Sequence, residues 1–221
     1  MVRREAVWAV IVARVGNGAK SRLAGALSAS QRRELALAML ADVVAVCVQA
    51  GDGVLDGTLA VVDSPAARLA VERGGAIAVL DPGTGDMNAA VVAGVRAARE
   101  RGATTAMVVP GDVPLIAVSD FERLLDAAGP ASRAVIVGAS HDGEGTNALL
   151  LRPPEVIFPG FGPPSLERHL QAGRRAGAFT RACTDLGLSL DVDTPADLAI
   201  LRSSRPGRHT AAALADVVTS P

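Results

Sequence analysis

Three charged side chains follow short apolar runs of the sequence, directly or within one loop: Lys20, Asp112 and Asp191. Mg2+ prefers oxygen ligands and often takes only one or two protein carboxylates, with phosphates and water completing its coordination. A lysine near such carboxylates neutralises phosphate charge. If the apolar runs are strands of an open α/β sheet, their carboxyl ends form the usual ligand-binding edge. These residue types therefore indicate a metal-dependent reaction at a phosphate group.

The first of these segments, Arg14–Arg22, is a loop with glycines and positive charge. Its glycines allow the backbone to approach a phosphate, which Arg14, Lys20 and Arg22 can neutralise. The GxxxxGK[ST] spacing of a P-loop is missing. Considered alone, this loop is explained equally well as an ordinary surface turn.

Asp112 lies in the segment Pro110–Pro114, directly behind Thr105–Val109, which has the apolar pattern of a buried strand. The prolines on both sides fix the backbone around the carboxylate. We interpret Asp112 as a metal ligand, and a simple turn residue is the alternative.

The segment Leu190–Leu198 contains three carboxylates with separate expected roles. Asp191 comes at the end of an apolar run and is free to be the second metal ligand. Asp193 or Thr194 is placed to cap the helix that follows, and Asp197 falls in its first turn, near the positive end of the helix dipole. We therefore expect Asp193 and Asp197 to be structural.

Two further segments, Gly143–Asn147 and Phe161–Ser165, offer small residues, backbone N–H groups and the hydroxyls of Thr146 and Ser165. Ser165 is placed to cap a helix, and a helix N-terminus attracts phosphate or carboxylate. An anion-binding role is one interpretation, and a plain helix cap is the other.

The three histidines, His141, His169 and His209, have no Cys or Glu at metal-binding spacing, so we expect them to be solvated or structural. No GxSxG motif supports nucleophilic catalysis by serine. A phosphate monoester has a second pKa of about 6 and is already anionic near neutral pH. As a nucleophile it needs positioning and charge neutralisation rather than a general base.

Composition and charge narrow the class of protein. The 221 residues carry a formal net charge of −1, so we expect no broad basic face for nucleic acid, and Arg174–Arg175 is interpreted as solvated. No apolar run reaches the roughly 18 residues of a membrane helix, since the longest, Leu35–Val48, contains Asp42. Cys47 and Cys183 lack metal spacing, which fits a reducing cytoplasm. We therefore expect a cytoplasmic protein that binds neither nucleic acid nor membrane.

Apolar runs alternate with helical patterns, which predicts an α/β fold with a mostly parallel central sheet and helices on both faces. The expected strands are Val7–Val12, Thr58–Val62, Ala76–Leu80, Thr105–Val109, Ala134–Val137, Ala148–Leu151 and Leu186–Leu190, and the fifth and sixth are joined in a way that allows an antiparallel pair. The expected helix starts are Ser28 with Gln31, Ser64-Pro65, Met87, Ser119 with Glu122, Ser165 and Thr194-Pro195. We expect a single domain over residues 1–204 and a weakly held tail over residues 205–221.

Several of these segments together resemble one enzyme family. They are Ala19–Ala24, Leu27-Ser28, Ala38–Val43, Gly85 with Asn88, Gly111–Pro114, Gly145–Leu151, Phe161–Pro163 and Asp191–Pro195. Each motif is short, but jointly and in this order, over about residues 7 to 201, they resemble the 2-phospho-L-lactate / phosphoenolpyruvate guanylyltransferases. That family makes the activated precursor of the deazaflavin coenzyme F-420.

The resemblance implies a Rossmann-like nucleotidyltransferase fold of the glycosyltransferase-A type. It implies transfer of GMP from GTP to a small three-carbon phospho-acid, with Mg2+ as cofactor and release of pyrophosphate. The product would then pass to a downstream transferase. The oligomeric state stays open, a homo-oligomer included.

The resemblance also implies roles for single residues. By this likeness Asp112 and Asp191 match the metal-binding aspartates, and Lys20 matches the basic residue that faces the triphosphate. The positions that hold the carboxylate and phosphate of the acid are matched by Thr146, Gly162 and Ser165. The guanine pocket and the neighbouring substrate loop are matched by Gly85 and Asn88.

Two residues depart from the family pattern. Arg14 stands where the family often has a lysine, which keeps the charge but changes its geometry. Asp86 stands where a small or apolar residue is more usual, and this bears on the choice of base or acceptor.

Three alternatives remain beside this reading. One is a different acceptor, such as 3-phosphoglycerate, although a composition typical of bacteria favours phosphoenolpyruvate. Another is a nucleotidyltransferase of the molybdenum-cofactor or sugar-phosphate type, but these usually open with a Leu-Ala-Gly-Gly-type loop that this chain lacks. The third is a non-catalytic nucleotide-binding module, which would need fewer metal ligands than Asp112, Asp191 and Lys20 suggest.

Overall fold

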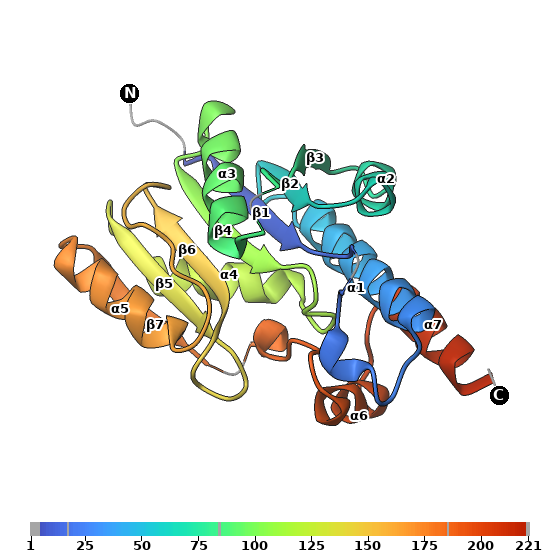
Figure 1. Ribbon diagram of the computed structural model, residues 1–221. Coiled ribbons are helices and arrows are strands. Elements are labelled where there is room, and N and C mark those ends of the chain that lie inside the picture. The colour runs from blue at the N-terminus through green and yellow to red at the C-terminus, as the bar shows by residue number, and fades with distance from the viewer. Residues whose placement is uncertain (1–4, 17, 84, 185, 220–221) are drawn as a thin grey trace.

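A seven-stranded sheet in the order β3-β2-β1-β4-β6-β5-β7 forms the centre of the computed structural model (Figure 1). The structure describes residues 5–16, 18–83, 85–184 and 186–219, so that Asn17 of the first loop lies outside the described residues. The strands are β1 Val7–Ala13, β2 Gly57–Val62, β3 Ile77–Leu80, β4 Thr105–Pro110, β5 Ala134–Ala139, β6 Thr146–Arg152 and β7 Phe179–Cys183. The helices are α1 Ala29–Gln49, α2 Pro65–Arg73, α3 Met87–Glu100, α4 Val118–Ala128, α5 Ser165–Arg175, α6 Pro195–Ser203 and α7 Arg208–Thr219, with short 3-10 helices η1 Ser21–Leu23 and η2 Gly187–Ser189.

The sheet is mixed but mostly parallel, as the alternation of strands and helices predicts. β1 runs parallel to β2 and β4, β2 to β3, and β5 to β7. β6 is antiparallel to both β4 and β5. Because β6 runs the opposite way, its first residues lie beside the carboxyl end of β4. This arrangement brings the segment that begins at Thr146 to the edge where Asp112 emerges.

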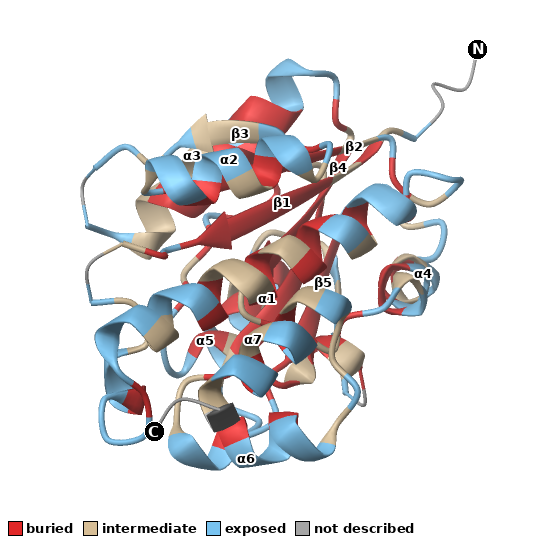
Figure 2. Cartoon of the chain, turned by 90° about the vertical axis from the view of Figure 1, so that its right-hand side faces the viewer, coloured by how far each residue is buried: buried red, intermediate tan, exposed pale blue. Residues whose placement is uncertain are grey.

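Alternate residues of the strands enter two separate cores, one on each face of the sheet. In β1, Ala9 and Ile11 pack with α1, α2 and α4, whereas Val10 and Val12 pack with α3 and α5. Figure 2 shows β1 buried along most of its length between these layers. Both faces of this strand are covered, which explains why it is a continuous apolar run in the sequence.

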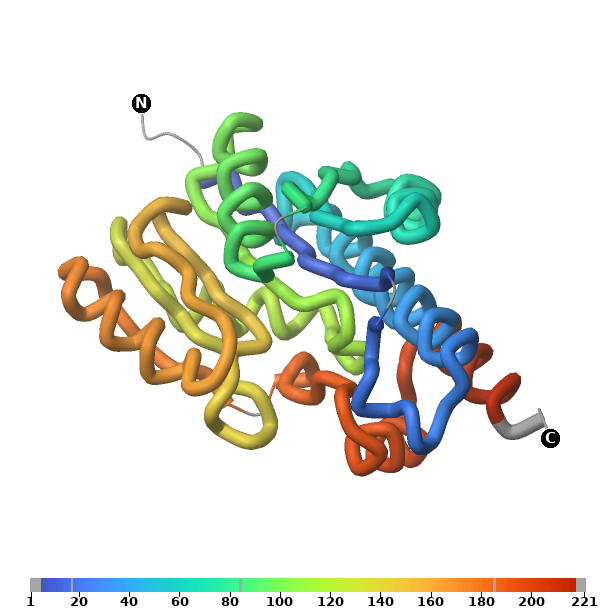
Figure 3. The backbone as a smooth tube through the Cα atoms, viewed as in Figure 1, coloured from blue at the N-terminus to red at the C-terminus, as the bar shows by residue number. Residues whose placement is uncertain are grey.

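A third, smaller core lies beside the carboxyl ends of the strands. It contains Leu23 and Leu27 behind the first loop, Leu190 and Val192 near the C-terminus, and residues of α1, α6 and α7. The tube in Figure 3 shows the chain around residues 20–28 running next to α6. This core therefore holds two segments together that are far apart in the sequence.

The helix caps predicted at Ser28 and Ser64 are present. The Ser28 hydroxyl accepts from the N–H of Gln31, whose side chain in turn accepts from the N–H of Ser28, and Ser64 caps α2 ahead of Pro65. The capping box predicted at Ser119 is wrong. Helix α4 begins at Val118, so its N-cap is Ala117, two residues before Ser119, and the Asp120 carboxylate accepts from the N–H of Ala117.

The strand predicted at Leu186–Leu190 is also wrong. This segment contains the 3-10 helix η2, closed by a bond from Ser189 N–H to the Leu186 carbonyl, and the Gly187 N–H donates to Asp120. Its alternating leucines divide between two cores, which produced the strand-like pattern. The seventh strand is β7, Phe179–Cys183, an edge strand whose exposed and half-buried residues carry no apolar signal.

The C-terminal segment is not the weakly held tail that the sequence suggested. Residues 208–219 form α7, which packs along α1. The buried Asp42 carboxylate of α1 accepts hydrogen bonds from the N–H groups of His209 and Thr210, at 3.1 and 2.8 Å. Asp42 therefore caps this helix, which explains a charge inside the apolar face of α1. Within the described residues, none of the helices is sufficiently long and apolar to cross a membrane.

Candidate active site at the carboxyl ends of the strands

Lys20 joins two carboxylates that come from distant parts of the chain. Its ammonium group donates to Asp112 and, at 2.8 Å, to Asp193, and its side chain is only 7% exposed. Burial lowers the pKa of Lys20, but the charges of Asp112 and Asp193 outweigh this effect and leave the pKa above its ordinary value. Lys20 therefore carries a full positive charge in an otherwise acidic site.

The backbone of Lys20 adopts a conformation that side chains rarely take. Its φ angle is 53° and its ψ angle 38°, in the left-handed region, and among the described residues it alone does so without being glycine. Such strain is kept only where the surrounding structure enforces it. Here Leu23, which follows in the same 3-10 turn, is fully buried in the third core and anchors the loop. Packing of that core therefore orients the Lys20 side chain toward Asp112 and Asp193.

Asp112 and Asp191 have the properties expected of cation ligands. Asp112 follows β4, and its Oδ1 atom is buried and has no hydrogen-bond partner among the described residues. Burial raises the pKa of Asp191, the hydrogen bond from Asn147 opposes this, and the nearby charges of Asp112 and Asp193 raise it further. A cation at this position would satisfy the orphaned oxygen and relieve the repulsion. The two aspartates therefore fit a bound metal ion.

The described residues contain no group of three or more His, Cys, Asp or Glu side chains arranged to hold a metal. Lys20 occupies the space between two of the three carboxylates. A metal ion here would rely on Asp112 and Asp191 together with oxygens from a substrate. This is the usual situation for Mg2+ in enzymes that act on nucleotide phosphates.

Asn147 positions Asp191, a role that the sequence did not reveal. Its amide nitrogen donates to the Asp191 carboxylate at 3.0 Å and to the Ser189 carbonyl at 2.8 Å. The register between β5 and β6 shifts at Gly138/Ala139, opposite this residue. Bulges of this kind redirect a side chain. At this shift the Asn147 side chain, which is itself buried, reaches Ser189 and Asp191.

The structure corrects the predicted role of Asp193. The cap of α6 is Thr194, whose hydroxyl accepts from Asp197 N–H, and the Asp197 carboxylate accepts in return from Thr194. Asp197 is structural, as predicted, whereas Asp193 forms ion pairs with Lys20 and, at 3.5 Å, with Arg22. Asp193 takes this role because the third core packs the first loop, through Leu23, against the segment that contains Val192, which places Lys20 next to Asp193.

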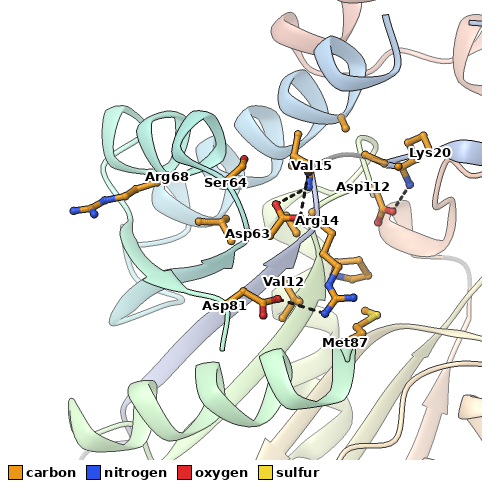
Figure 4. Close-up of a pocket in the computed structure, with 18 of the residues that line it drawn as sticks. Val12, Arg14, Val15, Lys20, Asp63, Ser64, Arg68, Asp81, Met87 and Asp112 are labelled. Atoms are coloured by element: carbon orange, nitrogen blue, oxygen red, sulfur yellow. Dashed lines mark hydrogen bonds and ion pairs between the residues drawn. The ribbon is translucent and has the colours of Figure 1, made fainter. Parts of the chain in front are cut away.

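A cleft of about 760 Å³ opens beside Lys20 at the carboxyl ends of β1, β2 and β3. Figure 4 shows Lys20 and Asp112 at one side of it and Asp81 and Arg68 toward the other. Among the predicted residues, Arg14, Lys20, Gly85, Asp112 and Asp193 line the cleft, which is large enough for a nucleotide. Arg22 is mostly exposed and forms an ion pair with Asp193, which lines the cleft.

Two carboxylates that line the cleft were not predicted. Asp63 follows β2 and accepts from the N–H groups of Val15 and Gly16, at 2.9 and 3.1 Å, which braces the first loop. Asp81 follows β3 and forms an ion pair with Arg14 at 3.5 Å. Both aspartates come directly after an apolar strand. The rule that pointed to Asp112 would therefore have found them too.

Asn88, assigned to the substrate loop, lies at the start of α3 and holds a second loop in place. Its side chain accepts from the N–H of Phe161 at 2.6 Å and donates to the Phe161 carbonyl at 3.3 Å. Gly85 lines the cleft with a φ angle of +74°, and its carbonyl accepts from Arg14. Asp86, which departs from the family pattern, caps α3 through the N–H of Asn88.

The structure brings Thr146 and Ser165 together, although they lie on different elements. The Ser165 hydroxyl donates to the Thr146 hydroxyl at 3.1 Å, and both residues are buried. Ser165 is the first residue of α5 rather than its cap, which is Pro164. The predicted helix cap at Ser165 is therefore wrong. The same hydroxyl of Thr146 also contacts Nδ1 of His169 at 3.0 Å.

The fold that carries this cleft is similar to that of solved nucleotidyl transferases. A nucleotidyl transferase from Methanothermobacter thermautotroptrophicus matches with a TM-score of 0.65 at 20% identity, over 90% of this chain and 96% of that chain. The Mycobacterium tuberculosis H37Rv protein Rv0371C, solved with manganese, matches with a TM-score of 0.55 at 21% identity, over 90% and 100%. The chain therefore has the fold of these nucleotidyl transferases.

Comparison of the sequence with known proteins identifies the family to which the chain belongs. Residues 7–217 match the model of the guanylyl transferase CofC-like family, and the chain belongs to that family. A phosphoenolpyruvate guanylyltransferase from Conexibacter woesei is 38% identical over 93% of this chain and 92% of its own length. A 3-phospho-D-glycerate guanylyltransferase from Phenylobacterium zucineum is 33% identical over 95% of each chain. The family resemblance read from the motifs is thereby confirmed.

Proposed function

We propose that this enzyme transfers GMP from GTP to phosphoenolpyruvate, with release of pyrophosphate, in the biosynthesis of coenzyme F-420. The observation that carries this proposal is the buried Lys20, which bridges Asp112 and Asp193 beside the 760 Å³ cleft. The relatives named phosphoenolpyruvate guanylyltransferases support the choice of acceptor. The product, an activated diphosphodiester, would pass to a downstream transferase.

In this reaction an oxygen of the acceptor's phosphate attacks the α-phosphorus of GTP. The new P–O bond forms as the bond between the α-phosphorus and the bridging oxygen breaks, and pyrophosphate carries away the electron pair. The attacking oxygen is already anionic near neutral pH, so no general base is required. The enzyme has to align two anions and offset their repulsion.

Lys20 is suited to the triphosphate, because it keeps its charge and lines the cleft. Arg14 and Arg68 add positive charge farther along the same cleft. Asp112 and Asp191 would hold Mg2+, which supplies charge stabilisation at the reacting phosphate. Lys20, which donates to Asp112 and Asp193, has a third N–H that would donate to a phosphate oxygen.

Thr146 and Ser165, with the backbone N–H groups around Gly162, are suited to the carboxylate and phosphate of the acid. Gly162 has a φ angle of +96°, and nothing lies within 4 Å of the position that a Cβ would take. Because glycine has no side chain, this space is left for a small ligand to approach the backbone. The donors to an anion would therefore be the Thr146 hydroxyl and these N–H groups, while the Ser165 hydroxyl donates to Thr146.

The acceptor has one serious rival, because a relative of similar coverage is named for 3-phospho-D-glycerate. The test is a competition experiment with GTP, Mg2+ and equal amounts of phosphoenolpyruvate, 2-phospho-L-lactate and 3-phosphoglycerate. Product masses identify the acceptor, and Asp112→Asn is the control for enzyme-dependent release of pyrophosphate. We expect the phosphoenolpyruvate product to dominate. Preferential use of either other acid would replace phosphoenolpyruvate in the proposal.

A further inference from the structure

His169 is buried in α5 and uses both of its ring nitrogens. It is 1% exposed, its Nε2 atom lies 2.9 Å from the backbone nitrogen of Gly160, and its Nδ1 atom lies 3.0 Å from the Thr146 hydroxyl. The Phe161 ring and the imidazole pack edge to face, with their centroids 5.0 Å apart. The ring therefore has a fixed orientation between the loop at Gly160 and the hydroxyl of Thr146.

The partner of Nε2 determines where the ring carries its proton. A backbone N–H can only donate, so Nε2 must present its lone pair to Gly160. A neutral imidazole has one N–H, which is then on Nδ1. Burial, with a smaller effect from the charge of Arg168, lowers the pKa of His169 to about 4, so the ring is neutral near pH 7. Nδ1–H therefore donates to the Thr146 hydroxyl.

This donation fixes the direction of the remaining bonds at Thr146. A hydroxyl has two acceptor lone pairs and one hydrogen. The oxygen of Thr146 accepts from His169 and also from Ser165. Both of its lone pairs are then occupied, and its own hydrogen remains to be donated. A hydroxyl prepared in this way suits an anion and disfavours a ligand that must donate.

We propose that His169 is a positioning residue that makes the Thr146 hydroxyl an obligatory donor to the carboxylate or phosphate of the acceptor. This inference rests on the proposed function for the identity of the ligand, but the hydrogen-bond direction itself does not. His169 acts on the acid only through Thr146. It belongs to the half of the site that binds the acid and not to the cleft beside Lys20.

The bond to Gly160 is separable from this role, because other residues hold the same loop. Arg168 donates to the carbonyls of Gly160 and Gly162, and Asn88 binds both backbone groups of Phe161. Loss of the acceptor at Nε2 therefore leaves the loop with several anchors. Loss of the donor at Nδ1 leaves Thr146 free to rotate.

Two substitutions divide the ring into its two functions. His169→Asn places an amide nitrogen near the position of Nδ1 and keeps a donor for Thr146, whereas His169→Gln places an amide oxygen near the position of Nε2 and keeps an acceptor for Gly160. We expect His169→Gln to raise the Michaelis constant for the acid roughly tenfold, as for one hydrogen bond to a charged ligand, and that for GTP by less than about twofold. We expect His169→Asn to stay within about threefold of wild type for both substrates. His209→Gln, in α7, is the matched control.

Steady-state kinetics with each substrate varied in turn tests the proposal on the purified protein. Equal effects of both substitutions on the acid, or equal effects on acid and GTP, would mean that His169 only supports the fold. In the background of Thr146→Val, His169→Gln should add almost nothing, because it acts through that hydroxyl. If His169→Gln raises the Michaelis constant for the acid as much in that background as in wild type, His169 does not act through Thr146.

A spectroscopic measurement separates this inference from the proposed function. In protein labelled with 15N-histidine, the His169 signals are assigned by their loss in His169→Gln. We expect the Nδ1–H tautomer at pH 7 without any substrate. The Nε2–H tautomer or a charged ring would overturn the inference even in an active enzyme. With the Nδ1–H tautomer present, failure to use any acid would overturn the proposed function alone.

Discussion

Lys20 and Asp193 are 173 positions apart in the sequence, yet their side chains form an ion pair with 2.8 Å between ammonium and carboxylate. The pair forms because Leu23 and Val192, their neighbours in the chain, are buried in the same third core. Packing at the side of the sheet thus determines the charge distribution in the site. It also makes Asp193 a residue of the site, with Thr194 as the helix cap.

This relationship separates the expected effects of Asp193→Asn and Thr194→Ala. Asp193→Asn should lower kcat/KM roughly tenfold or more, the scale of a hydrogen bond between charged groups, with little loss of stability. Thr194→Ala should lower the free energy of unfolding by about 1 kcal/mol, as loss of a helix cap does, with little change in rate. Urea unfolding and steady-state kinetics on both variants distinguish the two roles. The reverse pattern would make Asp193 structural after all.

Asp112→Asn and Asp191→Asn should each reduce kcat at least about a hundredfold while the fold survives, because each removes charge that would hold the proposed metal at the reacting phosphate. Asp112→Asn should also leave the position of the Lys20 side chain less fixed, since the ammonium loses one of its two carboxylate partners. The measurement is turnover at saturating Mg2+, with circular dichroism to check folding. Near wild-type turnover in either variant would remove that residue from the metal site.

Thr146→Val and Ser165→Ala should each raise the Michaelis constant for the acid roughly tenfold and that for GTP much less. Because the Ser165 hydroxyl donates to Thr146, the double variant should be less than additive. Kinetics with each substrate varied in turn measures both constants. If the GTP constant rises and the acid constant does not, the two halves of the site are reversed.

The low pKa of His169 predicts a pH dependence of stability. The folded pKa of about 4 lies below the ordinary value of 6.5, so the unfolded chain binds more protons between these values. The stabilisation from keeping this ring neutral is fully present above about pH 6.5 and is lost as the pH falls toward 4. The full change amounts to about 3 kcal/mol for one buried group, from about 1.36 kcal/mol per pKa unit.

Urea unfolding at pH 7.0 and 4.5, on wild type and His169→Gln, measures this effect. Other groups titrate in both proteins, so the quantity compared is the pH-dependent change in unfolding free energy. We expect a smaller decrease in His169→Gln. Identical decreases would show that His169 does not titrate between the folded and unfolded states.

Much of the sheet could be predicted because its central strands are buried on both faces and therefore appear as continuous apolar runs. The same property located Asp112, since a polar residue directly behind such a run marks the ligand-binding edge. Asp63 and Asp81 follow β2 and β3 in the same way and were within reach of this argument. Edge strand β7 could not be recognised, because partial exposure removes the pattern.

Other features depend on contacts that no local pattern encodes. The ion pair of Lys20 with Asp193, the hydrogen bond between Ser165 and Thr146, and the docking of α7 through Asp42 all join distant segments. Leu186–Leu190 shows the opposite failure, a regular pattern produced by leucines that enter two different cores. Family likeness identified Thr146 and Ser165, but only the fold shows that they form one hydrogen-bonded unit with His169.

The most direct test of the central claim follows the α-phosphate of GTP. The protein is incubated with Mg2+, phosphoenolpyruvate and GTP labelled either at the α- or at the γ-phosphate, and products are separated and identified by mass. We predict that α-label enters a guanylylated acid only when the acid is present, that γ-label appears in pyrophosphate, and that Asp112→Asn abolishes both. Release of γ-label as inorganic phosphate, or no acid-dependent product with any of the three acids, would contradict the assignment of this site to guanylyl transfer.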